Sequence, residues 1–218
     1  MISEILPAVV ECAEAFGDPP DAALFPAEEA LLARAVEKRR REFATGRQCA
    51  RSALGALGIG PAPILPGQGG APQWPSGIVG SITHCAGYRA AAAARASEVV
   101  TIGLDAEPAQ SLPGEVLGLV TRPDERDRLR DLARDAPGVC WDTLLFSAKE
   151  SVYKAWFPLA RRWLGFTDAD IAINAENGTF EARLLIAAPA SSGVPPTGFN
   201  GRWLARDGLL LTAITVLA

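Results

Sequence analysis

The chain has few of the residues that mark several common protein classes. It contains one histidine and one methionine, and its four cysteines are scattered without a C-x-x-C pair: Cys12, Cys49, Cys85 and Cys140. This spacing favours reduced, partly buried thiols over a disulfide framework, and it offers no zinc site of the usual kind. There is also no G-x-S-x-G segment, so the sequence does not predict the nucleophile elbow of a serine hydrolase.

Long apolar runs and an excess of basic charge are missing as well. No apolar run reaches the roughly 18 residues that a membrane-spanning helix needs. The N-terminal segment carries Glu4 and Glu11 where a secretory leader would be basic and then apolar. With 21 Lys and Arg against 25 Asp and Glu, the net charge of −4 does not favour a nucleic-acid partner. We therefore expect a cytoplasmic monomer that binds neither nucleic acid nor a membrane.

The positive charge that is present is concentrated in one segment. Seven cations lie close together there: Arg34, Lys38, Arg39, Arg40, Arg41, Arg47 and Arg51. Such a run is either the solvated face of a helix or an anion-binding surface, and the spacing alone leaves both interpretations open. The 218 residues, of which 49% are hydrophobic, suffice for one large domain or two small ones.

The hydrophobic pattern predicts an α+β fold in which helices precede strands in each half. Helices are expected at about 26–43, 47–57, 123–134 and 141–157, with Gly46 as a break between the first two. Strands are expected near 78–82, 89–94, 99–105, 171–175, 180–185, 201–206 and 209–216. Residues 58–77 are rich in proline and glycine and predict an extended loop. The segment 108–113 is the predicted internal boundary, which divides the chain into halves 1–108 and 109–218.

Three acidic residues indicate a metal site. Asp105 and Glu107 end the predicted strand that begins at the apolar run 99–102, and alternation along a strand points them the same way. Glu150 lies on a predicted helix. Three carboxylates that converge would form a hard-cation site of the kind Mg²⁺ uses when it also holds phosphates. The alternatives are a helix cap, pairing with arginine, and an ordinary helix pair of Glu150 with Lys154.

His84 follows the segment Gly80-Ser81-Ile82-Thr83, which is rich in hydrogen-bond donors. A lone histidine is more often structural than catalytic, but a donor-rich segment also suits an anion. The aromatic residues after Glu150 are most simply interpreted as core. They are Trp156, Phe157, Trp163 and Phe166.

Three motifs, together with the basic segment, carry a family resemblance. They are G-L-D-A-E at 103–107, F-S-A-K-E-S-V-Y-K at 146–154, and G-x-x-x-W-P-x-G-x-x-G-S-x-T-H ending at His84. From about Arg39 to Phe166 the chain resembles the 4'-phosphopantetheinyl transferases, within them the surfactin-synthetase-activating type and its enterobactin-synthase component D branch. The resemblance implies two similar α+β halves packed side by side with the active site at their interface.

The resemblance also implies an activity and its partners. The phosphopantetheine arm of coenzyme A would pass to a serine of an apo acyl or peptidyl carrier protein, and 3',5'-ADP would leave. Asp105, Glu107 and Glu150 would hold Mg²⁺, with Mn²⁺ as an alternative. Lys149 and Glu150 would activate the serine and steady phosphate charge, and the resemblance does not decide which of the two is the base.

Further residues match positions that bind coenzyme A in relatives. Arg39, Arg47 and His84, with Ser81 and Thr83, would contact its phosphates. Phe146, Tyr153 and Trp163 would line the trough for the pantetheine arm, next to Lys149. The loop 66–69 has no lysine where many relatives carry one, so the resemblance does not extend that contact to this chain.

Two other functions remain open from the sequence. One is a different Mg²⁺-dependent phosphotransferase or diphosphatase that acts on a nucleotide. The other is a module that binds coenzyme A or a carrier domain without turnover. The pathway of the carriers (fatty acid, polyketide or nonribosomal peptide) is not encoded in any motif that we find.

Overall fold

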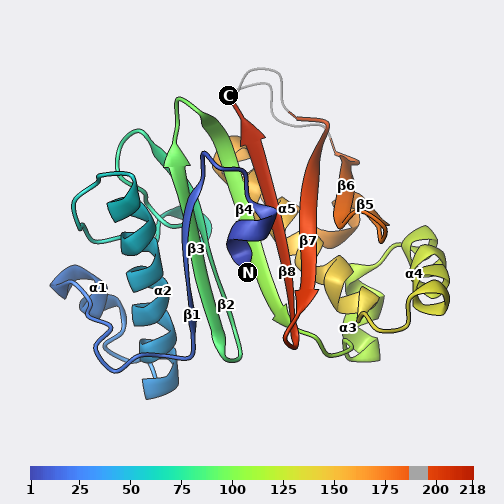
Figure 1. Ribbon diagram of the computed structural model, residues 1–218, viewed down its shortest axis with the longest axis horizontal. Coiled ribbons are helices and arrows are strands. Elements are labelled where there is room, and N and C mark those ends of the chain that lie inside the picture. Colours follow the sequence, from blue (N-terminus) through green and yellow to red (C-terminus); the bar gives the residue numbers. More distant parts are fainter. Residues whose placement is uncertain (187–195) are drawn as a thin grey trace.

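The computed structural model describes residues 1–186 and 196–218 and shows an α+β molecule with two antiparallel sheets (Figure 1). The three-stranded sheet has the order β1-β3-β2 and comprises β1 (Glu11–Phe16), β2 (Ile78–Cys85) and β3 (Tyr88–Arg95). The five-stranded sheet has the order β4-β8-β7-β6-β5 and comprises β4 (Val99–Pro108), β5 (Ala169–Asn174), β6 (Thr179–Leu184), β7 (Gly198–Arg206) and β8 (Leu209–Leu217). The predicted fold class is confirmed.

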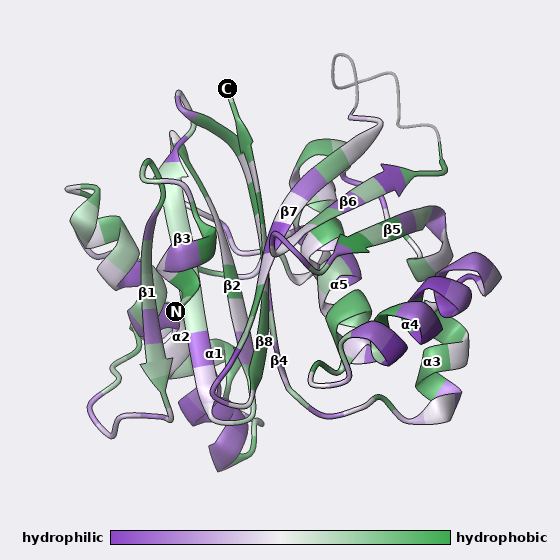
Figure 2. Ribbon diagram, turned by 45° about the vertical axis from the view of Figure 1, so that its right-hand side comes forward, coloured by the Kyte–Doolittle hydropathy of each residue, from purple (hydrophilic) through white to green (hydrophobic). Residues whose placement is uncertain are grey.

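The helices cover the sheets from both ends of the molecule. They are α1 (Pro26–Leu31), α2 (Glu37–Ala56), α3 (Gly114–Val120), α4 (Pro123–Asp135) and α5 (Trp141–Ala160), with 3-10 turns at Ile2–Ile5, Gln68–Gly70 and Phe166–Asp168. Helix α2 packs on β3 and β1, and α5 packs on β4 and β8. Helix α4 is mostly hydrophilic and lies with α3 at the end opposite α2 (Figure 2). Within the described ranges, no helix combines the length and apolar character that crossing a bilayer requires.

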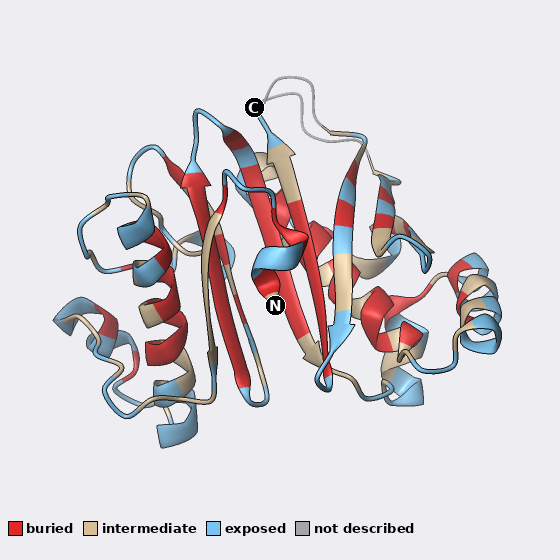
Figure 3. Cartoon of the chain, viewed as in Figure 1, coloured by how far each residue is buried: buried red, intermediate tan, exposed pale blue. Residues whose placement is uncertain are grey.

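Strand β3 is the middle strand of the three-stranded sheet and lies between helix α2 and the five-stranded sheet. Its run of five alanines, Ala90–Ala94, is fully buried on both faces. One face packs under Ala50 and Leu54 of α2, and the other meets Leu104 of β4 and Leu211 of β8. Small side chains let a helix and a second sheet approach the same strand closely. The buried residues of β3, β4 and β8 accordingly line up through the middle of the molecule (Figure 3).

The predicted break at Gly46 is wrong. Helix α2 runs without interruption through this residue, and the chain breaks earlier, between Leu31 and Glu37. Gly46 is buried, and a Cβ atom built on it would lie 3.4 Å from the Ile82 side chain. The glycine therefore faces strand β2 inside a regular helix, where tertiary packing outweighs its low helix propensity.

Two elements were not predicted. Strand β1 is short and its residues are mostly half-buried, and α3 has only seven residues with one of them, Val120, buried. Neither gives a clear hydrophobic period. The division into halves at residue 108 stays a prediction, although hydrogen bonding places β4 in the sheet of the C-terminal half.

Candidate active site

Helix α5 lies unusually close to strand β4, and this contact builds the site. A Cβ atom on Gly103 would lie 2.0 Å from the carbonyl oxygen of Ser151, so only glycine fits there. Along the helix, an apolar stripe packs into the core. It consists of Leu144, Leu145, Ala148, Val152, Ala155 and Trp156. Residues 105 and 107 follow Gly103 on the same face of β4, so both acids face α5.

Asp105 and Lys154 form an ion pair at this contact. The ammonium group of Lys154 donates to Oδ1 of Asp105 at 2.7 Å, and the Asp105 side chain is 6% exposed. The hydroxyl of Thr83 on β2 donates to the same oxygen at 3.4 Å. The second oxygen, Oδ2, is buried and has no hydrogen-bond partner among the residues that the structure describes. A buried carboxylate oxygen without a partner is costly, which makes it a candidate ligand atom.

Both of the other two acids have raised pKa values. Burial, followed by the charge of Asp105, raises the pKa of Glu107 to about 7. Burial and Asp105 also raise the pKa of Glu150. Closely spaced carboxylates disfavour one another's ionised forms, and a bound cation would relieve this. Among the described residues the side chains are not gathered into a ready-made metal cage; instead, the Lys154 ammonium lies against Asp105.

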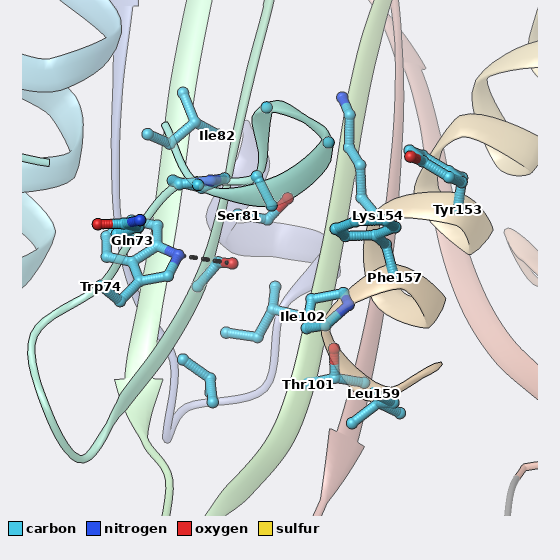
Figure 4. A pocket seen from close by; sticks show the side chains of 18 of the residues that line it. Gln73, Trp74, Ser81, Ile82, Thr101, Ile102, Tyr153, Lys154, Phe157 and Leu159 are labelled. Carbon is cyan, nitrogen blue, oxygen red and sulfur yellow. Dashed lines mark hydrogen bonds between the residues drawn. The ribbon is translucent and has the colours of Figure 1, made fainter. Parts of the chain in front are cut away.

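A cavity of about 650 Å³ opens beside these groups, between the two halves of the chain (Figure 4). One wall is the loop 67–74 with strand β2, including Trp74 and Ser81, and the other is α5, including Glu150, Tyr153 and Lys154. Trp74 is fixed by its indole N–H, which donates to the Gly80 carbonyl at 3.0 Å. The volume is in the range of sites that bind a cofactor-sized molecule.

Lys149 points away from this cavity into the protein. Its ammonium group donates to Oε2 of Glu125 at 2.7 Å and to the carbonyls of Phe166 and Ala169 at 2.7 and 3.2 Å. The side chain is 1% exposed, and that of Glu125 is fully buried. Burial lowers the pKa of Lys149, and Glu125 opposes this shift. All three donors of the ammonium group thus have protein partners.

The predicted phosphate-contacting residues of the basic segment occupy different environments. Arg39 is exposed, and its Nη1 donates to Nε2 of His84 at 2.9 Å. Since arginine can only donate, the imidazole is neutral with its proton on Nδ1. Partial burial and then the Arg39 charge lower the pKa of His84.

Arg47 is buried, with its Nε donating to the Ile64 carbonyl at 2.7 Å and its guanidinium over the Phe43 ring. Burial lowers its pKa to about 10. Among the described residues, the wall of the 650 Å³ cavity includes neither of these arginines nor His84. The contact between Arg39 of α2 and His84 lies near the end of β2, just beyond Thr83. Arg47, also on α2, is buried.

Ser81 and Thr83 join β2 to β4. The Ser81 hydroxyl accepts a hydrogen bond from the Leu104 amide at 3.0 Å, and Thr83 lies between Asp105 and Lys154. Of the two, Ser81 also lines the large cavity. Both hydroxyls therefore link the three-stranded sheet to the five-stranded sheet next to the acids.

The aromatic residues form a second, smaller cavity of about 70 Å³ next to Glu150. The rings of Tyr153 and Trp163 are 4.9 Å apart, and those of Phe146 and Phe166 are 5.7 Å apart. Trp163 is 69% exposed, so it is not the core residue that its hydrophobic character suggests. Tyr153 lines both cavities.

Comparison with known proteins decides the family. The profile of the 4'-phosphopantetheinyl transferase N-terminal domain matches residues 27–94, and that of the 4'-phosphopantetheinyl transferase superfamily matches residues 101–193. The chain is 53% identical to 4'-phosphopantetheinyl transferase Svp of Streptomyces mobaraensis, over 100% of this chain and 90% of the relative. The chain belongs to the 4'-phosphopantetheinyl transferase superfamily.

Other relatives agree with this membership. 4'-Phosphopantetheinyl transferase PptT of Mycobacterium tuberculosis is 48% identical over 99% of this chain and 98% of its own length. Enterobactin synthase component D of Salmonella typhi is more distant, at 33% identity over 85% of this chain and 76% of its own length. The resemblance found in the motifs is thus confirmed, as is the expectation of a transferase of this class.

Sequence reasoning missed one residue of this phosphopantetheinyl transferase site. Lys154 was named only in the alternative of an ordinary helix pair with Glu150, but the structure pairs it with Asp105 across the contact of α5 and β4. The available signal was its spacing of four residues from Glu150, which places both on one face of the helix. Spacing within a helix cannot tell which strand that face meets.

Proposed function

We propose that the protein transfers the 4'-phosphopantetheine arm of coenzyme A to a serine of apo acyl or peptidyl carrier proteins and releases 3',5'-ADP. The observation that carries this proposal is the pairing of Lys154, which lines the 650 Å³ cavity together with Glu150, with the buried Asp105 behind it. Family membership supplies the reaction class. The cavity supplies room for an extended substrate between the loop 67–74 and α5.

The three acids fit a divalent metal. Their oxygens are hard donors, one buried oxygen of Asp105 has no partner, and two of the carboxyls carry raised pKa values. We infer that Asp105, Glu107 and Glu150 hold Mg²⁺, with Mn²⁺ as an alternative. When bound, the ion would neutralise charge on the diphosphate of coenzyme A.

The chain's own residues account for the rest of the chemistry. The ammonium group of Lys154 is exposed to the cavity and can pair with a phosphate oxygen as readily as with Asp105. Glu150 borders both cavities, and its carboxylate is placed to accept the serine proton. We therefore assign the base to Glu150. Lys149, held by Glu125, anchors α5 beneath it.

The proposed reaction is a single displacement at phosphorus. The serine oxygen forms a bond to the phosphorus next to the pantetheine arm as its proton passes to Glu150. The bond from that phosphorus to the oxygen shared with the second phosphate breaks, and 3',5'-ADP leaves with the electron pair. Most of the rate enhancement should come from positioning and electrostatics, because the residues present form no covalent intermediate.

The remaining predicted residues would bind the two ends of coenzyme A. Arg39 and His84 would bind a phosphate group at the end of β2. Arg47, Ser81 and Thr83 would contribute further phosphate contacts from less exposed positions. Tyr153 and Trp163, with Phe146, would line the path of the pantetheine arm. The contact between the Tyr153 and Trp163 rings, and the position of both residues beside Glu150 in the small cavity, support this assignment.

The carboxamide series tests the proposal. Asp105→Asn, Glu107→Gln and Glu150→Gln keep the shape of each side chain and remove its charge. Each should lower transfer to an apo carrier by at least about a hundredfold while the circular dichroism spectrum stays unchanged. Near-normal turnover of two of the three at saturating Mg²⁺ would contradict the site. Glu4→Gln, in an exposed pair with Arg206, is the matched control and should be fully active.

A further inference from the structure

Three hydroxyl groups form a buried cluster between helix α5 and strand β8. Ser147, Ser151 and Thr212 are all fully buried. Oγ1 of Thr212 lies 2.9 Å from the Ser147 hydroxyl and 2.7 Å from the Ser151 hydroxyl. It also donates to the Ser147 carbonyl at 3.0 Å. The Thr212 hydroxyl thus has three hydrogen-bond partners, and the Ser151 hydroxyl also lies 3.2 Å from the Thr212 carbonyl, to which it can donate.

The surroundings of this cluster are otherwise apolar. Leu144 and Val152 of α5 and Leu210 and Ile214 of β8 belong to the same core. Apolar contacts are non-directional and tolerate small shifts of one element along another. A fully satisfied hydrogen-bond network does not, because each bond has a required distance and angle. The cluster therefore fixes one position of α5 along the strand.

This position determines how the groups of the site meet. Thr212 is the direct cross-strand neighbour of Asp105 in the β4–β8 ladder. On the helix, Ser147 precedes Glu150 by three residues and Ser151 precedes Lys154 by three, so each serine is one turn from a group that faces Asp105. The 2.7 Å contact between Lys154 and Asp105 requires α5 to sit at the observed height.

We propose that Thr212, through Ser147 and Ser151, is a positioning residue that sets the spacing between Glu150 on α5 and the acids on β4, and so the affinity of the site for its metal ion. This inference rests on the proposed function, since it assumes that these acids bind a divalent cation. The hydroxyl of Thr212 itself touches neither substrate nor metal. Its effect is transmitted through the helix that carries Glu150.

The test measures metal binding without turnover. Mn²⁺ is titrated into the full-length protein with coenzyme A present and no carrier, and free Mn²⁺ is followed by electron paramagnetic resonance, with coenzyme A alone as the blank. Thr212→Val keeps the shape and removes the hydroxyl, and Thr212→Ser restores it. Thr143→Val is the matched control. Thr143 is a buried residue of α5, and its hydroxyl donates to the Gln110 carbonyl in a loop.

Thr212→Val should raise the Mn²⁺ dissociation constant about tenfold, at the low end of effects seen for residues that orient metal ligands. Thr212→Ser and Thr143→Val should bind Mn²⁺ like the wild type, even though Thr143→Val lowers the melting temperature. Equal affinities for Thr212→Val and Thr143→Val would overturn the inference. A wild type that binds no Mn²⁺ would instead overturn the proposed metal site. If Thr212→Val does not fold, Ser151→Ala and Ser147→Ala take its place, and wild-type affinity in both would overturn the inference.

Discussion

The two lysines of helix α5 differ in their partners, and under the proposed function this difference separates a stabilising role from a catalytic one. Lys149 is enclosed by Glu125 and two carbonyls, whereas Lys154 reaches from the helix to Asp105 at the cavity wall. Substitution of either lysine leaves a buried carboxylate without its cation, but the Lys149–Glu125 pair is enclosed whereas Lys154 is partly exposed to solvent. The same substitution should therefore affect stability more at Lys149 and transfer more at Lys154.

Lys149→Met should destabilise the fold by about 3–5 kcal/mol, because it leaves Glu125 buried without its cation. Lys154→Met should destabilise the fold less, because Thr83 still donates to Asp105, and should lower the transfer rate about a hundredfold or more. Urea unfolding and single-turnover transfer to an apo carrier measure the two effects. If Lys149→Met were stable and inactive, the anchoring role assigned to Lys149 would be wrong.

His84 provides a direct probe because it is the only histidine in the chain. Its pKa is lowered by partial burial and by Arg39, so it should titrate below the usual value of about 6.5. Arg39→Ala removes the nearby charge and should raise this pKa, and a bound phosphate should raise it further in the wild type. Proton NMR of the imidazole ring follows both shifts. A pKa that is unchanged in Arg39→Ala would contradict the contact between the two residues.

The same shift gives a sign to the pH dependence of stability. As pH falls, the unfolded chain takes up the His84 proton before the folded one does. This contribution to stability is complete above about pH 6.5 and declines as the pH falls toward the folded-state pKa. His84→Gln should remove that part of the decline, which unfolding measurements on both sides of pH 6.5 would detect.

At the scale of elements, two buried glycines have different meanings. Gly46 lies in helix α2 with room for a methyl group, and Gly103 lies in β4 where the Ser151 carbonyl excludes one. Gly46→Ala should stabilise the protein by about 0.5–1 kcal/mol through helix propensity. Gly103→Ala should destabilise it by about 3 kcal/mol or more, since α5 must move away from β4. Thermal unfolding of both variants tests this, and a destabilised Gly46→Ala would mean that the helix is kinked there.

The elements that the sequence predicts well are those with strong periodic patterns. Strands β2, β3 and β4 and helices α4 and α5 appear close to where the apolar spacing placed them. Gly46 was misinterpreted because propensity is local, whereas the packing of Gly46 on Ile82 joins distant segments. Strand β1 and helix α3 are too short and too exposed to produce a period.

At the scale of the whole molecule, the site depends on contacts that no local pattern contains. The motifs identified Asp105, Glu107 and Glu150, but the pairing of Lys154 with Asp105 arises only because α5 packs across β4. The inward direction of Lys149 follows from the position of α4, which brings Glu125 beneath it. Both depend on how distant elements meet, so a single sequence could name the motifs but not divide the two lysine roles.

The most direct test of the account is the product stoichiometry of one reaction. The protein is incubated with coenzyme A, Mg²⁺ and an apo carrier protein, and the carrier is weighed by intact-protein mass spectrometry while 3',5'-ADP is quantified. The account predicts that each carrier gains the mass of one phosphopantetheine on its serine, with one 3',5'-ADP released per carrier. Coenzyme A cleaved without modification of the carrier, or bound without any cleavage, would contradict it.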